Sequence, residues 1–256
     1  MRSDYRRPIY SDTVGKNHRK VLLILAGIVI AVAAVMYLFI HIHQNAGRPD
    51  KDKYPILGVS LSQTDGYQDF HVLKKHGVNF VYLKSTQGAQ YFDDSFDDNY
   101  MRVQGSDLSY GVYHYYSFDS SPQNQFKNFT NNVNQRIGDL PITIQVQPYG
   151  SYEQKLPNKK KTIENVAKLQ YLLENYYNRQ VIIQVTPQFK YLLNNPSNKG
   201  WLVTNKEPDD QKNINFWQYT TAGRIPSLAS SNKFNISVFR GSYKTWKNYI
   251  ETEENY

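Results

Sequence analysis

Two amide side chains alternate with apolar residues in one short stretch of the chain. The run LPITIQVQP at 140–148 is typical of a β-strand, and it carries Gln145 and Gln147. Residues two apart on a strand face the same side, so we expect both amides to project into one cleft. An amide has no ionisable proton near neutral pH, but it hydrogen-bonds well to hydroxyl and acetamido groups. The pair therefore suits ligand binding better than acid–base catalysis.

Aromatic side chains lie on or just after other predicted strands, and the chain contains 22 tyrosines. Aromatic faces can stack on sugar rings, although each of these residues could equally pack in the core. With one further amide, the binding candidates are Gln87, Tyr113, Tyr115, Tyr149, Trp217 and Tyr219. His114 adjoins Tyr113 and points to the other side of its strand, so we expect a hydrogen-bonded core histidine rather than a catalyst.

Several kinds of site are excluded by composition. The chain has no Cys, and its six His show no H-x-x-x-H or H-E-x-x-H spacing, so we expect no metal site. No G-x-G-x-x-G or Walker loop occurs, and we expect no cofactor. Residues 1–20 contain six Lys or Arg and two Asp, which is half of the net charge of +8. The remainder is too weakly basic to indicate nucleic-acid binding.

The elements that must position these side chains alternate between strands and helices. An alternating β/α order predicts a parallel sheet, and eight strands suffice for a closed barrel of the TIM type. The last strands lack long helices between them, so we expect an irregular barrel over 55–248 and a polar tail at 249–256. Strands are predicted at 56–61, 79–85, 110–118, 140–148, 180–186, 200–205, 215–220 and 234–239. Helices are predicted at 67–76, 97–107, 122–137, 162–177 and 189–193.

An apolar segment precedes this domain. Residues 21–41 carry no charge and are long enough to cross a membrane as one helix. A cleaved signal peptide would be shorter and would end in small residues, whereas here the apolar run continues beyond its alanines. The basic residues 1–20 place the N-terminus in the cytoplasm and the domain outside the cell. Residues 42–54 are polar and read as a linker.

Five sequence runs, in order, resemble the glycoside hydrolase family 25 muramidases (lysozymes). They lie in GVSLSQTDGYQDFHVLKKHGVNFVYLKSTQG (58–88), GVYHYY (111–116), LPITIQVQ (140–147), NFWQYTTAGRIPSL (215–228) and FNISVFRGS (234–242). The resemblance covers about residues 54–246. It implies a modified β/α barrel that binds peptidoglycan glycan strands at the C-terminal ends of its strands.

The same resemblance shows that the family's carboxylates are missing. Its catalytic acidic positions match Ser60, Gln145, Gln147 and Asn235, and the glutamate of its K-[AS]-T-E-G motif matches Gln87. Cleavage of a glycosidic bond needs a proton donor and stabilisation of a cationic centre, and neutral side chains supply neither. The degenerate positions therefore predict a pseudoenzyme on a lysozyme scaffold.

Three functions remain open from the sequence. The first is a membrane-anchored extracellular domain that binds peptidoglycan without cleaving it. The second is an active muramidase with relocated carboxylates, for which Asp119 and Glu153 follow predicted strands on the appropriate side. The third is a cell-envelope assembly or scaffold protein that binds another envelope protein.

Overall fold

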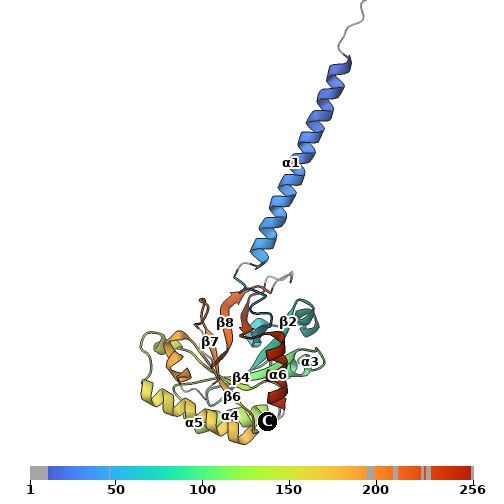
Figure 1. The fold of residues 1–256 in the computed structure, drawn as a ribbon. Coiled ribbons are helices and arrows are strands. Elements are labelled where there is room, and N and C mark those ends of the chain that lie inside the picture. The colour runs from blue at the N-terminus through green and yellow to red at the C-terminus, as the bar shows by residue number, and fades with distance from the viewer. Residues whose placement is uncertain are drawn as a thin grey trace, which may run out of the picture. The chain divides into compact units, whose positions relative to one another are not determined.

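A computed structural model describes residues 11–45, 47–194, 199–209, 213–225, 228 and 232–254 (Figure 1). The chain divides into two compact units, Met1–Ala46 and Gly47–Tyr256. The first is helical where it is described, and the second contains all of the described strands.

The first unit is one long helix, α1 (Ser11–Asn45). Its segment Lys20–Tyr37 has a mean hydropathy of 2.5, and none of it is buried. At a rise of 1.5 Å per residue, 18 residues span about 27 Å, close to the hydrocarbon thickness of a bilayer. By length and composition this helix can cross a membrane, in agreement with the predicted segment 21–41.

The second unit is a closed barrel. Neighbouring strands follow the order β1-β9-β8-β7-β6-β5-β4-β2-β3, and pairing of β1 with β2 closes the ring of eight while β3 adds to its edge. Their bounds are β1 Leu57–Leu61, β2 Val78–Gln87, β3 Tyr91–Phe92, β4 Ser109–Tyr115, β5 Ile142–Val146, β6 Val181–Val185, β7 Gly200–Val203, β8 Ile214–Gly223 and β9 Phe234–Phe239. The predicted TIM-like barrel is thus confirmed.

The barrel departs from a regular β/α barrel in its last part. The pairs from β1 through β2 and β4 to β8 are parallel, whereas β9 is antiparallel to both β8 and β1. β9 follows β8 in the sequence and pairs with it directly, in the opposite direction. This is the irregularity expected from the missing helices.

Helices surround the barrel and close one end of it. Their bounds are η1 Gln63–Asp65, α2 Phe70–Lys75, α3 Phe96–Val103, α4 Pro122–Val133, η2 Gly150–Glu153, α5 Lys159–Tyr177, η3 Pro187–Leu193 and α6 Tyr243–Glu254. Side-chain caps start three of them: Asp69 accepts from the Val72 amide, Ser121 from Asn124 and Asn158 from Lys161. The last helix, α6, crosses the boundary that the sequence placed at residue 248 and includes most of the expected polar tail.

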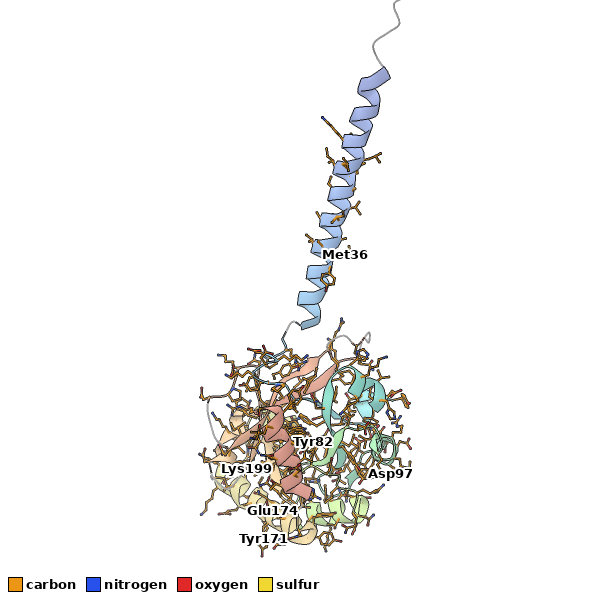
Figure 2. All side chains as sticks on the ribbon, turned by 45° about the vertical axis from the view of Figure 1, so that its right-hand side comes forward. Met36, Tyr82, Asp97, Tyr171, Glu174 and Lys199 are labelled. Carbon is orange, nitrogen blue, oxygen red and sulfur yellow. The ribbon has the colours of Figure 1, made fainter. Side chains whose placement is uncertain are left out.

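Two apolar cores lie on the two faces of the sheet. The outer core fills the space between strands and helices, and the inner core fills the barrel with Phe80, Tyr82, Trp201 and Phe216, closed by Trp246 of α6. Figure 2 shows Tyr82 within the barrel and Tyr171 and Glu174 on the outside, on α5. Because aromatic side chains and α6 fill the N-terminal end, polar groups gather at the other end.

Candidate ligand site at the mouth of the barrel

The mouth is the end of the barrel at which the parallel strands finish. Strand alternation decides which side chains reach it. On β5, Ile142, Ile144 and Val146 belong to the outer core, so the intervening Thr143 and Gln145 point into the barrel. Gln147 continues this alternation just beyond β5, and its amide nitrogen donates to the Tyr115 hydroxyl at 3.0 Å.

A belt of neutral polar side chains runs around the inside of the mouth. Gln145 is the register partner of Gln184 on β6. The Gln184 amide donates to Gln218 Oε1 at 2.8 Å, and Gln218 donates to Asn235 Oδ1 at 3.4 Å. Asn235 is in turn the register partner of Ser60. The structure therefore brings Ser60, Gln145 and Asn235, which the sequence singled out, into one belt with Gln184 and Gln218, which it did not.

Several buried polar atoms near this belt have no hydrogen-bond partner among the described protein atoms. They are Ser60 Oγ, Thr143 Oγ1, Thr186 Oγ1, Trp201 Nε1 and Ser237 Oγ. Ser60 is 4% exposed and Ser237 is fully buried. Leaving such a group unsatisfied costs about 1–3 kcal/mol, so these groups favour a polar ligand or solvent in the barrel.

Aromatic rings form one side of the mouth. The rings of Tyr115 and Tyr149 lie 6.1 Å apart, and Tyr149 stacks on Phe118 with a centroid distance of 5.5 Å. The Tyr149 hydroxyl accepts from the Phe118 amide at 2.9 Å, which fixes the ring. Both tyrosines are only half-buried, so part of each ring remains open to solvent.

A lysine lies beside these rings. Lys84 alternates with the inward-facing Phe80 and Tyr82 on β2, and its ammonium donates to Gln87 Oε1 at 2.8 Å. It also lies 4.9 Å from the Tyr91 centroid and 5.3 Å from that of Tyr115. Burial lowers the pKa of Lys84, and the nearby Asp93 charge partly opposes this effect. The hydrogen bond to Gln87 thus holds the Lys84 ammonium group at the mouth.

The two proposed replacement acids lie beside this aromatic side. Asp119 is exposed and accepts from the hydroxyls of Tyr149 at 2.9 Å and Tyr152 at 2.7 Å. Glu153 is exposed in η2, and its charge helps to raise the pKa of Tyr115, for which burial is the larger cause. These two hydroxyl donors hold the Asp119 carboxylate against the aromatic side of the mouth.

Two other carboxyl groups lie near the mouth that the sequence did not single out. The charges of Asp65 and Asp93 both raise the pKa of buried Tyr113, although burial is the main cause. Burial also raises the pKa of each carboxyl. Asp65 accepts from the Ser62 amide at 2.7 Å, and Asp93 accepts from the Gln63 and Ser95 amides. These bonds hold the loop after β1, so both groups have a structural role.

Three sequence candidates are not at the open part of the mouth. Trp217 and Tyr219 belong to the outer core, because they flank the inward-facing Gln218 on β8. Tyr113 is 6% exposed and packs in the inner core. Strand parity could have placed the first two correctly, since neighbours of an inward residue face outward.

His114 is a core residue, as expected. It is fully buried on the outer face of β4, where its ring contacts Phe129. Its two nitrogens pair with Thr86 Oγ1 at 2.8 Å and Gln125 Oε1 at 3.0 Å. Burial lowers its pKa to about 4.

Comparison with known proteins identifies relatives of the barrel. The family model described as "Glycosyl hydrolases family 25" matches residues 59–228. The chain is 30% identical over 90 residues to an autolytic lysozyme of Clostridium acetobutylicum, an alignment that covers 35% of this chain and 28% of the relative. It is 31% identical over 64 residues to lysozyme M1 of Streptomyces globisporus, covering 25% and 22%. The alignments thus span about a quarter of each curated relative.

Solved structures extend the likeness over the whole barrel. A family 25 glycosyl hydrolase from Bacillus anthracis superimposes with a TM-score of 0.70 at 26% identity, covering 78% of this chain and 96% of that one. The modular autolysin LytC from Streptococcus pneumoniae, solved with a synthetic peptidoglycan ligand, gives 0.59 at 16% identity, covering 72% and 46%. At that identity the second likeness concerns the fold alone.

Proposed function

Because this chain belongs to the family 25 glycosyl hydrolases, we propose that its barrel binds the glycan strands of peptidoglycan without cleaving them. We further propose that α1 anchors the domain in the cell membrane, with residues 1–20 in the cytoplasm and the barrel outside. The proposal rests on one observation above all: the inward-facing side chains at 145 and 147 are amides, and Gln147 is bound to Tyr115.

The chemistry of the mouth supports binding. The belt presents amide and hydroxyl groups, which match the hydroxyl and acetamido groups of a glycan. Tyr115 and Tyr149 present aromatic faces on which a sugar ring can stack. None of the belt residues carries a charge or a dissociable proton near neutral pH, so the belt offers no general acid and no anion.

The competing hydrolytic mechanism has weaker support. Asp119 is held by two tyrosine hydroxyls, and Asp65 and Asp93 are engaged by backbone amides. Glu153 is solvent-exposed. A proton donor for glycoside cleavage must be able to reach the scissile oxygen, and these contacts instead hold Asp119 on tyrosines and Asp65 and Asp93 on the loop after β1. An envelope-scaffold role would use the outside of the barrel and would leave the mouth without a function.

A binding experiment on the full chain in detergent micelles tests the proposal. Sedimentation with insoluble peptidoglycan should show binding, and Gln147→Ala should weaken it by about threefold to tenfold, the value of one or two hydrogen bonds. Tyr115→Ala should weaken it at least as much. The matched controls are Gln104→Ala, exposed after α3, and Tyr171→Ala, exposed on α5. Equal effects of the mouth and control variants would reject the mouth as the binding site.

A further inference from the structure

Residues 47–54, which precede β1, contact the barrel rather than lying free of it. The sequence reads as a polar linker over 42–54, yet Tyr54 is 4% exposed and its ring lies 5.6 Å from that of Trp217 on β8. The Tyr54 hydroxyl and the Lys53 ammonium both bond to the Glu207 carboxylate. Earlier in the segment, half-buried Arg48 lies close enough to Tyr219 to oppose the rise of its pKa, which burial takes to about 12.

These contacts fix the end of the barrel at which the chain arrives. β8 is parallel to β7, so it runs toward the mouth from Trp217 to Tyr219. The segment passes Tyr219 first, at Arg48, and Trp217 second, at Tyr54. The chain therefore joins the domain at the mouth end of β8 and descends its outer face to β1.

Only a short stretch of chain separates the apolar segment from Arg48, the first residue of 47–54 that lies near β8. The 18-residue window that is long and apolar enough to cross a membrane ends at Tyr37, within the predicted segment 21–41, and α1 continues as helix to Asn45. The eight helical residues after Tyr37 rise about 12 Å, and the three residues to Arg48 can add at most about 10 Å. With α1 in a membrane, the attached rim of the mouth can therefore lie no more than roughly 25 Å beyond the apolar segment.

We infer that the mouth takes glycan still carried at the membrane surface, namely saccharides linked to a lipid carrier, in preference to detached glycan. This inference rests on the proposed function and deepens it. A ligand held in the same membrane is presented to a short-tethered mouth at a high effective concentration, whereas a soluble ligand is not. The tether thus selects among chemically similar glycans by their location.

Cross-linking in vesicles tests this inference with the full chain. A photoreactive amino acid replaces Tyr91, which is 36% exposed on β3 and faces Lys84 at the mouth. One probe is a polyprenyl-diphosphate-linked N-acetylglucosaminyl–N-acetylmuramyl saccharide in the same vesicles. The other is the same saccharide, free in solution at equal bulk concentration. We expect at least tenfold more cross-linking to the lipid-linked probe.

A variant with a longer connection between α1 and the barrel supplies the control. Inserting twenty Gly/Ser residues between Ala46 and Gly47 should reduce the preference severalfold, because effective concentration falls with linker length. The same insertion after Tyr256 should leave it unchanged. Equal cross-linking of both probes, or no effect of the longer tether, would overturn the inference while the proposed function stands. No cross-linking of either probe would count against both.

Discussion

The side chain of Gln147 shows how one residue changes the chemistry that the mouth can perform. Its amide donates to the Tyr115 hydroxyl, a bond that holds the ring at the edge of the site. A carboxylate in its place could accept from that hydroxyl and, when protonated, could give its proton to a leaving oxygen. The amide keeps a hydrogen bond and a similar size, but it has no proton to transfer and no charge with which to stabilise a cation.

Carboxyl groups reintroduced at the mouth should therefore restore glycan cleavage only when all four positions are changed together. Gln145→Asp with Gln147→Glu should give little release of reducing sugar, because Ser60 and Asn235 remain neutral. The fourfold variant that adds Ser60→Asp and Asn235→Asp should give measurable release from peptidoglycan. General acid–base assistance typically contributes about 10²–10⁴ in rate, so even partial recovery is detectable.

The stability of that variant provides an internal check. Ser60 is 4% exposed, and its hydroxyl has no partner among the described atoms. A carboxyl group there would be desolvated, so the fourfold variant should unfold at lower urea concentration than the double variant. Equal stability would mean that position 60 is better solvated than the structure indicates.

Between the strands β1 and β2, the ring of Phe80 fits over Gly58 because Gly58 has no side chain. A Cβ at this position would lie 2.2 Å from the ring of Phe80, which is itself fully buried among other aromatic rings. Gly58→Ala should therefore lower the free energy of unfolding by about 1–3 kcal/mol, as measured by urea denaturation. Adding Phe80→Leu should recover part of this loss, and strictly additive effects would contradict the proposed clash.

The His114 contacts link β2, β4 and α4 and should make the stability of the barrel depend on pH. Burial lowers its pKa in the folded protein to about 4, below the ordinary value of 6.5, so the unfolded chain binds the proton more readily. The contribution to stability is present above pH 6.5 and is lost as pH falls toward 4, by about 3 kcal/mol in total. Urea denaturation at pH 7.5 and 4.5 measures this loss. His114→Gln should show a smaller loss, and an unchanged one would rule out His114 as its cause.

The elements differ in how well the sequence predicts them. Eight strands and the barrel follow from the alternation of apolar runs and helices, because this pattern directly reflects burial on the two faces of a sheet. The α6 helix was missed because polar and charged residues dominate this short terminal stretch around Trp246 and Ile250. The two-residue strand β3 is too short to have a pattern.

The site was predicted in part. Strand alternation correctly turned Gln145 into the barrel, but the same rule applied to Gln218 would have moved Trp217 and Tyr219 to the outer face. Gln184 went unnoticed, although a lone amide in the buried run VIIQV signals an inward polar contact. The alternation of residues along strands does not predict loop conformation. It therefore could not show which carboxyl groups on loops approach the mouth.

At the scale of the whole chain, the order of parts predicts a topology. Protease added to intact cells should remove the barrel and leave residues 1–20 protected, because the basic flank precedes the apolar segment. An antibody against each end distinguishes the fragments. A protected barrel would reverse the orientation, and a shortened barrel free in the medium would indicate cleavage of the apolar segment.

We expect this lysozyme-like barrel to bind glycan without cleaving it, and a turnover assay separates binding from cleavage. The full chain is incubated with peptidoglycan at concentrations at which binding is demonstrated, and released reducing ends are measured against an active family 25 lysozyme. We predict no release above the buffer control. Release that Asp119→Asn or Glu153→Gln abolishes would contradict this account and would establish a muramidase with relocated carboxylates.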